Sequence, residues 1–134
     1  MKDLKLTITI NKPVEEVFAF TINPENTPKW IDSIVTEQTN EWPVKLGTIY
    51  RNQRKNGEWS DYEITAFDPN KTFVMSQKND SFHVGYTFTP TDNGAATQLT
   101  YRVWKDESEL PGSLTVDVLQ DILDKLKRLV EDRE

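Results

Sequence analysis

The sequence predicts an α+β domain in which a seven-stranded, curved antiparallel sheet wraps around a long C-terminal helix. Three observations lead to this prediction. Apolar and polar residues alternate in a series of short segments, which is typical of strands with one buried face. Short turn sequences separate most of these segments, as expected for an antiparallel meander. The last segment, residues 114–132, instead carries apolar residues at helical spacing.

The first strand and two short helices are expected within residues 4–30. Residues 4–10 alternate strictly between apolar and polar side chains, which predicts a half-buried strand. Pro13 then suits the first turn of a helix, because its missing N–H needs no partner there. This helix has one apolar side and ends before Pro24, since proline does not continue a helix. We expect a second helix of one or two turns from Pro24 to Trp30.

The next part of the chain is expected to form consecutive strands. The clearest turn signal is Asn56-Gly57, because both residues tolerate the positive φ values of a tight hairpin. Together with the first strand, these strands form a sheet with one apolar face, which must be covered. The expected strands are residues 33–42, 48–55, 58–67, 72–78, 81–89 and 97–104.

The C-terminal helix is the element that can cover this face. At 1.5 Å per residue, residues 114–132 span about 28 Å, which is enough to cross a small domain. Because a twisted sheet curves away from a straight helix, we expect a cavity between the two. The predicted apolar stripe of the helix comprises Leu114, Val118, Leu119, Ile122, Leu126, Leu129 and Val130.

Length and composition indicate one domain and argue against several kinds of site. The 134 residues contain no linker or repeat, so we expect a single domain over residues 1–134. The absence of cysteine excludes disulfides and thiolate chemistry, and it fits a cytoplasmic protein. With a single histidine and no phosphate-binding glycine loop, we expect no metal and no cofactor.

The charge balance limits the partners that we expect. The formal net charge of −6 repels phosphate backbones, and acidic residues follow the short basic run from Arg51 to Lys55. We therefore expect no nucleic-acid partner. No apolar run approaches the ~20 residues of a membrane span, so we expect no membrane span either. For the oligomeric state we expect a monomer or a weak dimer, with a protein partner left open.

Short motifs, in a fixed order along nearly the whole chain, match those of a known group of proteins. They are residues 10–18 (INKPVEEVF), 67–71 (FDPNK) and 86–90 (YTFTP), and the helix ends with Leu126, Lys127 and Glu131. This pattern resembles the START/Bet v 1-like (SRPBCC) superfamily, and within it the bacterial polyketide cyclase/dehydrase-like proteins. The resemblance implies a helix-grip fold with a cavity. It implies no catalytic residue, because the motifs are turns, caps and core positions.

The resemblance and the apolar sheet face favour binding of a small hydrophobic or amphipathic ligand, lipid- or polyketide-like. Two alternatives stay open at this point. One is a polyketide cyclase/dehydrase-like enzyme with tyrosines as acid/base candidates, and the other is an Hsp90-activator-like protein-interaction module using exposed Trp59 and Trp104. The residues expected to bind the ligand are Trp30, Tyr50, Tyr62, Met75, Tyr86, Phe88, Tyr101, Val118 and Ile122.

Four positions allow two interpretations each. Trp30 either gates the cavity or joins the helices to the sheet, and Tyr86 either faces a ligand or only packs in the core. Arg54 either pairs with a ligand carboxylate or lies in solvent. His83 alternates with apolar neighbours, so we expect it on the exposed face, with no evident partner to orient it; the alternative, a catalytic base, needs a bulge that turns it inward.

Overall fold

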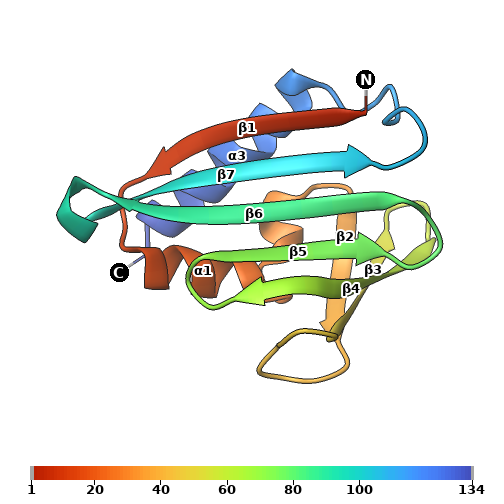
Figure 1. Cartoon of the computed structure of the whole chain (residues 1–134), viewed down its shortest axis with the longest axis horizontal. Coiled ribbons are helices and arrows are strands. Elements are labelled where there is room, and N and C mark those ends of the chain that lie inside the picture. The colour runs from red at the N-terminus through yellow and green to blue at the C-terminus, as the bar shows by residue number, and fades with distance from the viewer. Residues whose placement is uncertain (1, 134) are drawn as a thin grey trace.

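Alternating side chains place seven strands in one antiparallel sheet, as the sequence predicts. The computed structural model describes residues 2–133, so Met1 and Glu134, the ends of the predicted domain, lie outside it. Across the sheet the order is β1-β7-β6-β5-β4-β3-β2, a meander whose last strand pairs with the first (Figure 1). The strands are β1 (Asp3–Ile10), β2 (Ile34–Thr39), β3 (Ile49–Arg54), β4 (Trp59–Asp68), β5 (Thr72–Gln77), β6 (Phe82–Thr91) and β7 (Ala96–Lys105).

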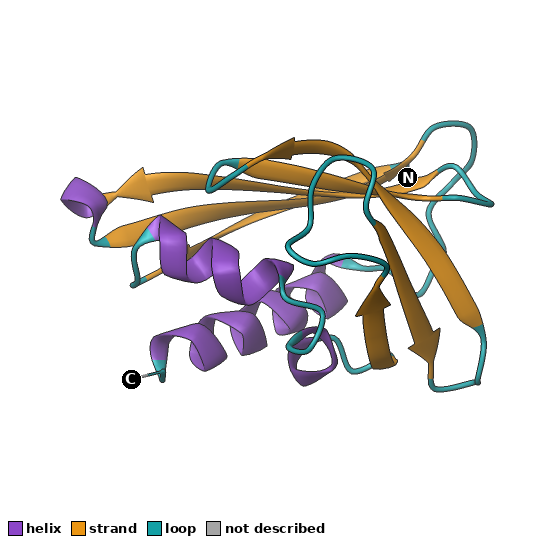
Figure 2. Cartoon of the chain, turned by 90° about the horizontal axis from the view of Figure 1, so that it is seen from below, coloured by secondary structure: helices purple, strands orange, loops and turns teal. Residues whose placement is uncertain are grey.

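The helices lie on the concave face of this sheet. Figure 2 shows α1 (Val14–Ile22) and α3 (Val116–Glu131) beneath the strands, with the short α2 (Thr27–Trp30) at one end. β2 and β3 turn down beside the helices, so the curved sheet encloses them on two sides. A single 3₁₀ turn (Asp92–Gly94) connects β6 to β7. This arrangement is the helix-grip architecture that the sequence predicts.

Local signals explain where the two longer helices begin. Glu15 and Glu16 lie in the first turn of α1, where negative charge complements the helix dipole. α3 begins at Val116, two residues later than predicted, because Thr115 is its N-cap residue. The Thr115 side chain accepts a hydrogen bond from the backbone N–H of Val118 at 3.2 Å.

The apolar stripe of α3 is centred on a different set of residues from the predicted one. Its fully buried side chains are Leu119, Leu123, Leu126 and Val130, and the prediction omitted Leu123. A helix turns by about 100° per residue, which places Val118 at the edge of this stripe. Val118 is therefore 41% exposed, and the prediction that it faces the sheet is wrong.

Aromatic side chains fill the space under one end of the sheet. Phe18 of α1 packs edge-on against Phe73 and Phe88, with ring centroids 5.8 Å and 5.2 Å apart. Phe73 also stacks on Tyr86 at 4.3 Å. Edge-to-face and offset-stacked pairs are favourable beyond the area they bury. These rings fill one end of the interior, so the open space lies toward the other end.

Candidate ligand-binding cavity

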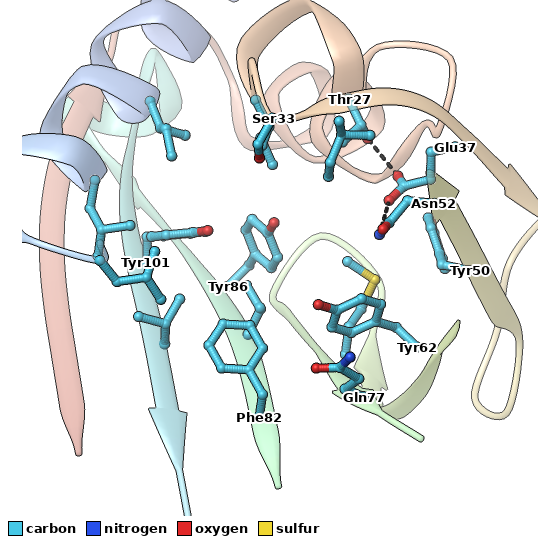
Figure 3. A pocket seen from close by; sticks show the side chains of 18 of the residues that line it. Thr27, Ser33, Glu37, Tyr50, Asn52, Tyr62, Gln77, Phe82, Tyr86 and Tyr101 are labelled. Carbon is cyan, nitrogen blue, oxygen red and sulfur yellow. Dashed lines mark hydrogen bonds between the residues drawn. The ribbon is translucent and has the colours of Figure 1, made fainter. Parts of the chain in front are cut away.

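A cavity of about 400 Å³ lies between the concave face of the sheet and α3 (Figure 3). This volume is within the roughly 300–1,000 Å³ of known small-molecule sites. Exposed residues Arg54, Asp80 and Ser113 mark the rim where the cavity meets solvent. The apolar side chains in its wall include Ile22, Ile31, Ile34, Phe73, Met75, Phe82, Val84, Val103, Leu114, Leu119 and Ile122.

The structure brings together most of the residues that the sequence predicts around this cavity. They come from six elements, since each of the five neighbouring strands β3 to β7 and the helix α3 contributes one inward-facing side chain. The predicted residues that line the cavity are Tyr50, Tyr62, Met75, Tyr86, Tyr101 and Ile122.

Three predicted residues lie outside the cavity lining. Trp30 is fully buried below the cavity and packs edge-on against Tyr86, with centroids 6.4 Å apart, so it joins the helices to the sheet. Phe88 belongs to the aromatic cluster at the filled end. Val118 lies on the solvent side of α3. Trp30 and Val118 instead line a second pocket, which shares Ile31, Ser33 and Ile122 with this cavity.

The tyrosine hydroxyls inside the cavity are hydrogen-bond donors rather than bases. Burial raises the pKa of Tyr50, Tyr86 and Tyr101 far above the usual range, which keeps all three protonated. The Tyr50 hydroxyl donates to the backbone carbonyl of Ile22 at 2.5 Å. Burial also raises the pKa of Tyr62, despite the nearby Arg54 guanidinium. The four tyrosines therefore give the cavity wall neutral polar groups.

Glu37 is a functional candidate that sequence reasoning missed. Its side chain is buried in the cavity wall, 8% exposed. The Thr27 hydroxyl donates to Oε1 at 2.6 Å, and the Asn52 amide donates to Oε2 at 3.3 Å (Figure 3). Burial raises the pKa of Glu37 to about 7, against the opposing effect of these two hydrogen bonds. A carboxyl group therefore titrates near neutral pH inside an otherwise apolar space.

A β-bulge explains why the alternation of β2 hid Glu37. The register with β3 shifts between Ile34 and Thr36, so one extra residue is inserted on β2. As a result Ile34 and Glu37, an odd number of residues apart, both line the cavity, while Val35 is exposed. The sequence does contain one signal: Asn52 is two residues from Tyr50 on β3, so it shares a face with Tyr50, and it is opposite Glu37 in the register.

The rim of the cavity carries charged side chains. Lys105 forms an ion pair with Asp80 at 3.0 Å, across the ends of β7 and the β5–β6 turn. Arg54, at the end of β3, is exposed, yet it lines the same rim. Arg54 thus lies in solvent, as one of its two interpretations expects, while its pairing with a ligand carboxylate stays a prediction.

His83 lies on the outer face, as predicted, but it does have orienting partners. Its Nδ1 is 2.7 Å from Ser76 Oγ, and its Nε2 is 2.7 Å from Asp106 Oδ2. The ring also stacks on Trp104, with centroids 5.0 Å apart. The expectation of no evident partner is therefore wrong. The register between β5 and β6 places Ser76 beside His83. Asp106 lies in the loop after β7, too far from His83 in sequence for a local motif to show that the two are in contact.

The two tryptophans proposed as one exposed patch lie apart on the outer face. Trp59 begins β4 and Trp104 lies near the end of β7, with β5 and β6 between these strands. Trp59 is 42% exposed, beside the Arg51 guanidinium. Trp104 is partly covered by Arg102, whose guanidinium carbon is 4.1 Å from the ring centroid, and by His83. They do not form one continuous surface.

Residues 2–133 contain neither a metal-binding cluster nor a membrane-spanning helix. No three His, Cys, Asp or Glu side chains in this range gather closely enough to hold a metal ion. No helix in the same range combines the length and apolar character needed to cross a membrane.

Solved structures with the same fold cover nearly the whole chain. A protein from Mesorhizobium loti has a TM-score of 0.77 at 18% identity, with 99% of each chain covered. A START superfamily protein from Mycobacterium smegmatis has a TM-score of 0.72 at 13% identity, covering 98% of this chain and 95% of the other. Ara h 8.0201 has a TM-score of 0.66 at 19% identity, with 98% of each chain covered. These similarities confirm the helix-grip fold.

The family comparison gives the same answer at the level of sequence. No curated protein sequence matches the chain. Residues 1–131 match the family model described as "Polyketide cyclase / dehydrase and lipid transport". The match confirms the resemblance that the short motifs indicate. The chain therefore belongs to the polyketide cyclase/dehydrase and lipid transport family.

Proposed function

We propose that this protein binds a small hydrophobic or amphipathic molecule in the cavity between the sheet and α3. The observation that supports this function is the cavity itself: about 400 Å³ of space stays open, although α3 lies across the sheet. Its wall is mostly apolar, and its charged residues other than Glu37 lie at the rim. Apolar groups bind in such a site because they leave water, while a few polar groups fix their orientation.

A neutral fluorescent reporter, N-phenyl-1-naphthylamine, tests this function, because its emission rises in an apolar site. The informative variant is Val103→Phe, since Val103 is buried in the cavity wall. The matched control is Val35→Phe, which adds the same group at an exposed position of β2 that does not line the cavity. We expect Val103→Phe to weaken reporter binding about tenfold or more, since overfilled apolar sites lose roughly 1–3 kcal/mol. Equal binding by wild type and both variants would contradict the proposal.

A second candidate function, proton-transfer catalysis on a bound carbonyl compound, is favoured by one specific observation. Glu37 lies in the cavity wall with a pKa raised by burial to about 7. A general acid or base works best when its pKa is close to the working pH. The tyrosines that the sequence suggested for this role stay protonated, so Glu37 replaces them as the candidate.

Deuterium exchange tests this second function without knowledge of the natural substrate. A bound general base removes protons next to the carbonyl of a small ketone such as 2-octanone, and deuterium from D₂O replaces them. NMR would follow this exchange with wild type and Glu37→Gln. Exchange that depends on Glu37 would favour catalysis. Exchange no faster than in buffer would leave ligand binding as the function.

A further inference from the structure

The polar corner of the cavity has a specific composition that limits the guest. Glu37 on β2, Asn52 on β3 and Thr27 on α2 meet there, and all three are at least nine-tenths buried. Figure 3 shows them together on one side of the cavity. The adjacent wall continues with apolar side chains such as Met75 and Val84. A guest that fills the cavity therefore meets one buried carboxyl group in this corner and a mostly apolar wall with neutral polar groups elsewhere.

The groups left over in this corner are acceptors. The Thr27 hydroxyl and the Asn52 amide already donate to Glu37, and the Tyr50 hydroxyl donates to Ile22. Asn52 Oδ1 is buried and has no hydrogen-bond partner within residues 2–133. A carboxylate has about four acceptor positions, and the two hydrogen bonds from Thr27 and Asn52 use only part of them. A buried acceptor without a partner costs free energy, so this corner favours a guest that donates hydrogen bonds.

The corner also has a charge without an opposite charge. None of the ion pairs formed within residues 2–133 includes Glu37, whose hydrogen-bond partners are neutral. The cations that line the cavity, Arg54 and Lys105, lie at the rim, where Lys105 is paired with Asp80. A buried carboxylate is stable when a cation accompanies it. A cationic guest would supply that charge.

We propose that the guest is an amphipathic amine, whose ammonium group donates to Glu37 and Asn52 Oδ1 while its apolar body lies along the rest of the cavity. This inference rests on the proposed function and adds the chemical class of the ligand. An ammonium group has three donors and no acceptor, which matches a corner that offers acceptors and negative charge. A carboxylate guest would instead place like charges together and leave Asn52 Oδ1 without a partner.

The proposal includes a dependence on pH. Burial raises the pKa of Glu37 to about 7, so the carboxyl group loses its charge as the pH falls below that value. The titratable groups near it are the hydroxyls of Tyr50, Tyr62 and Tyr86, which burial keeps protonated, and α2 presents the uncharged Thr27. Because an alkylammonium stays charged throughout this range, its binding follows the ionisation of Glu37.

Three guests with the same alkyl chain separate the head groups: octylamine, octanol and octanoate. Each would be titrated against the N-phenyl-1-naphthylamine reporter at pH 8 and pH 6. At pH 8 we expect octylamine to bind about 10- to 100-fold more tightly than octanol, since hydrogen bonds to charged groups are worth roughly 1.5–3 kcal/mol. At pH 6 the octylamine affinity should fall by about tenfold, in proportion to ionised Glu37, while octanol should not change.

Two charge-neutralising variants locate the effect. Glu37→Gln should remove the preference for octylamine and its pH dependence. Glu63→Gln is the matched control, because Glu63 lies on the outer face of β4 and pairs with Lys78 there. It changes the net charge by the same amount, so it should keep the preference. A further variant, Asn52→Ala, removes the unpartnered acceptor, and thermal melting would check that it folds. It should reduce the preference for octylamine by about threefold or more, the value of one hydrogen bond.

The possible failures are distinguishable. Octanol or octanoate binding as tightly as octylamine would overturn the amine proposal, while the proposed function would stand. A preference that survives in Glu37→Gln, or that is lost in Glu63→Gln, would also overturn it. If the reporter and all three guests fail to bind, the proposed function itself fails, and the amine proposal with it.

Discussion

The two faces of the sheet both carry charged and hydroxyl side chains, but they pair them differently. On the outer face Asp3 bonds to Arg102 with both carboxylate oxygens, and Asp106 bonds to His83. On the inner face Glu37 has only neutral partners, and Asn52 keeps an unpartnered buried oxygen. The outer groups have hydrogen-bond and charge partners within the protein, so they are explained by solubility and strand pairing. The inner groups lack some of these partners, which is the property expected of a binding site.

This difference also decides between two sites that look catalytic. The Ser76–His83–Asp106 chain has the residue types of a hydrolase triad, but it lies on the outer face. Ser76 also shares a hydrogen bond with Thr65 at 2.8 Å, so its hydroxyl is occupied. The cavity beneath the sheet includes none of these three groups. Chemistry is therefore better sought at Glu37, inside the cavity.

The largest expected effect tests whether the inner face supports the fold. Leu99→Ala removes a fully buried side chain from the inner face of β7 and should destabilise the protein by about 2–5 kcal/mol. Its neighbour Thr100 points to the outer face, where its hydroxyl is 3.5 Å from that of Thr7. Thr100→Ala should change stability by less than about 0.5 kcal/mol. Chemical denaturation would measure both, and equal effects would show that the assignment of the faces is wrong.

The second effect concerns the pH dependence of stability. Glu37 has a higher pKa in the folded protein, about 7, than the 4.5 of an unperturbed glutamate side chain. Its contribution to stability is complete below pH 4.5 and is lost as the pH rises through 7. The loss is up to about 3 kcal/mol, since a tenfold change in proton affinity is worth about 1.4 kcal/mol. Denaturation of wild type and Glu37→Gln from pH 5 to pH 8 should show a smaller decrease for the variant.

A third, smaller effect has the opposite sign on the outer face. Arg102 lowers the pKa of Asp3 below its usual range, mainly through their hydrogen bonds. The contribution of Asp3 to stability is thus present above pH 3.8 and is lost as the pH falls below that value. Because the Asp3 side chain is 46% exposed, Asp3→Asn should cost at most about 1 kcal/mol at neutral pH. A larger loss for Asp3→Asn than for Leu99→Ala would contradict this account of the outer face.

The smallest expected effect is at His83. If function resides in the cavity, His83→Gln should leave the affinity for N-phenyl-1-naphthylamine unchanged, because the ring contacts Ser76, Asp106 and Trp104 on the outer face. Tryptophan fluorescence should change in the same variant, since the His83 ring stacks on Trp104. Loss of reporter binding in a folded variant would contradict this expectation, because it would show that His83 on the outer face affects binding in the cavity.

The fold was predictable because its strands and helix follow regular periods. In β6, Phe82, Val84, Tyr86 and Phe88 alternate without interruption, so their inward direction is evident from sequence. The depth of each side chain within the interior is not evident from sequence. Phe88 and Tyr86 share a face, yet Phe88 packs against Phe18 of α1 and Tyr86 lines the cavity. Periodicity gives the face of a strand, whereas the position along that face depends on elements distant in sequence.

The site was predictable only where the period is unbroken. The bulge in β2 inverts the alternation, which hid Glu37, a buried carboxyl group in the cavity wall whose pKa is raised to about 7. In α3, Val118 and Leu119 are adjacent apolar residues, and either could belong to the buried stripe. The choice depends on Leu123 and Leu126, which fix the centre of the stripe once the helix packs.

Met75 gives the most direct test of the central claim, that the space beneath the sheet accepts a guest. Its side chain lines the cavity, and it is the single methionine within residues 2–133. In protein with ¹³C-labelled methionine methyl groups, the Met75 signal would be assigned with Met75→Leu. We predict that octanol shifts this signal and gives nuclear Overhauser contacts between its alkyl chain and the Met75 methyl group. An unchanged Met75 signal, without such contacts at saturating octanol, would contradict the account.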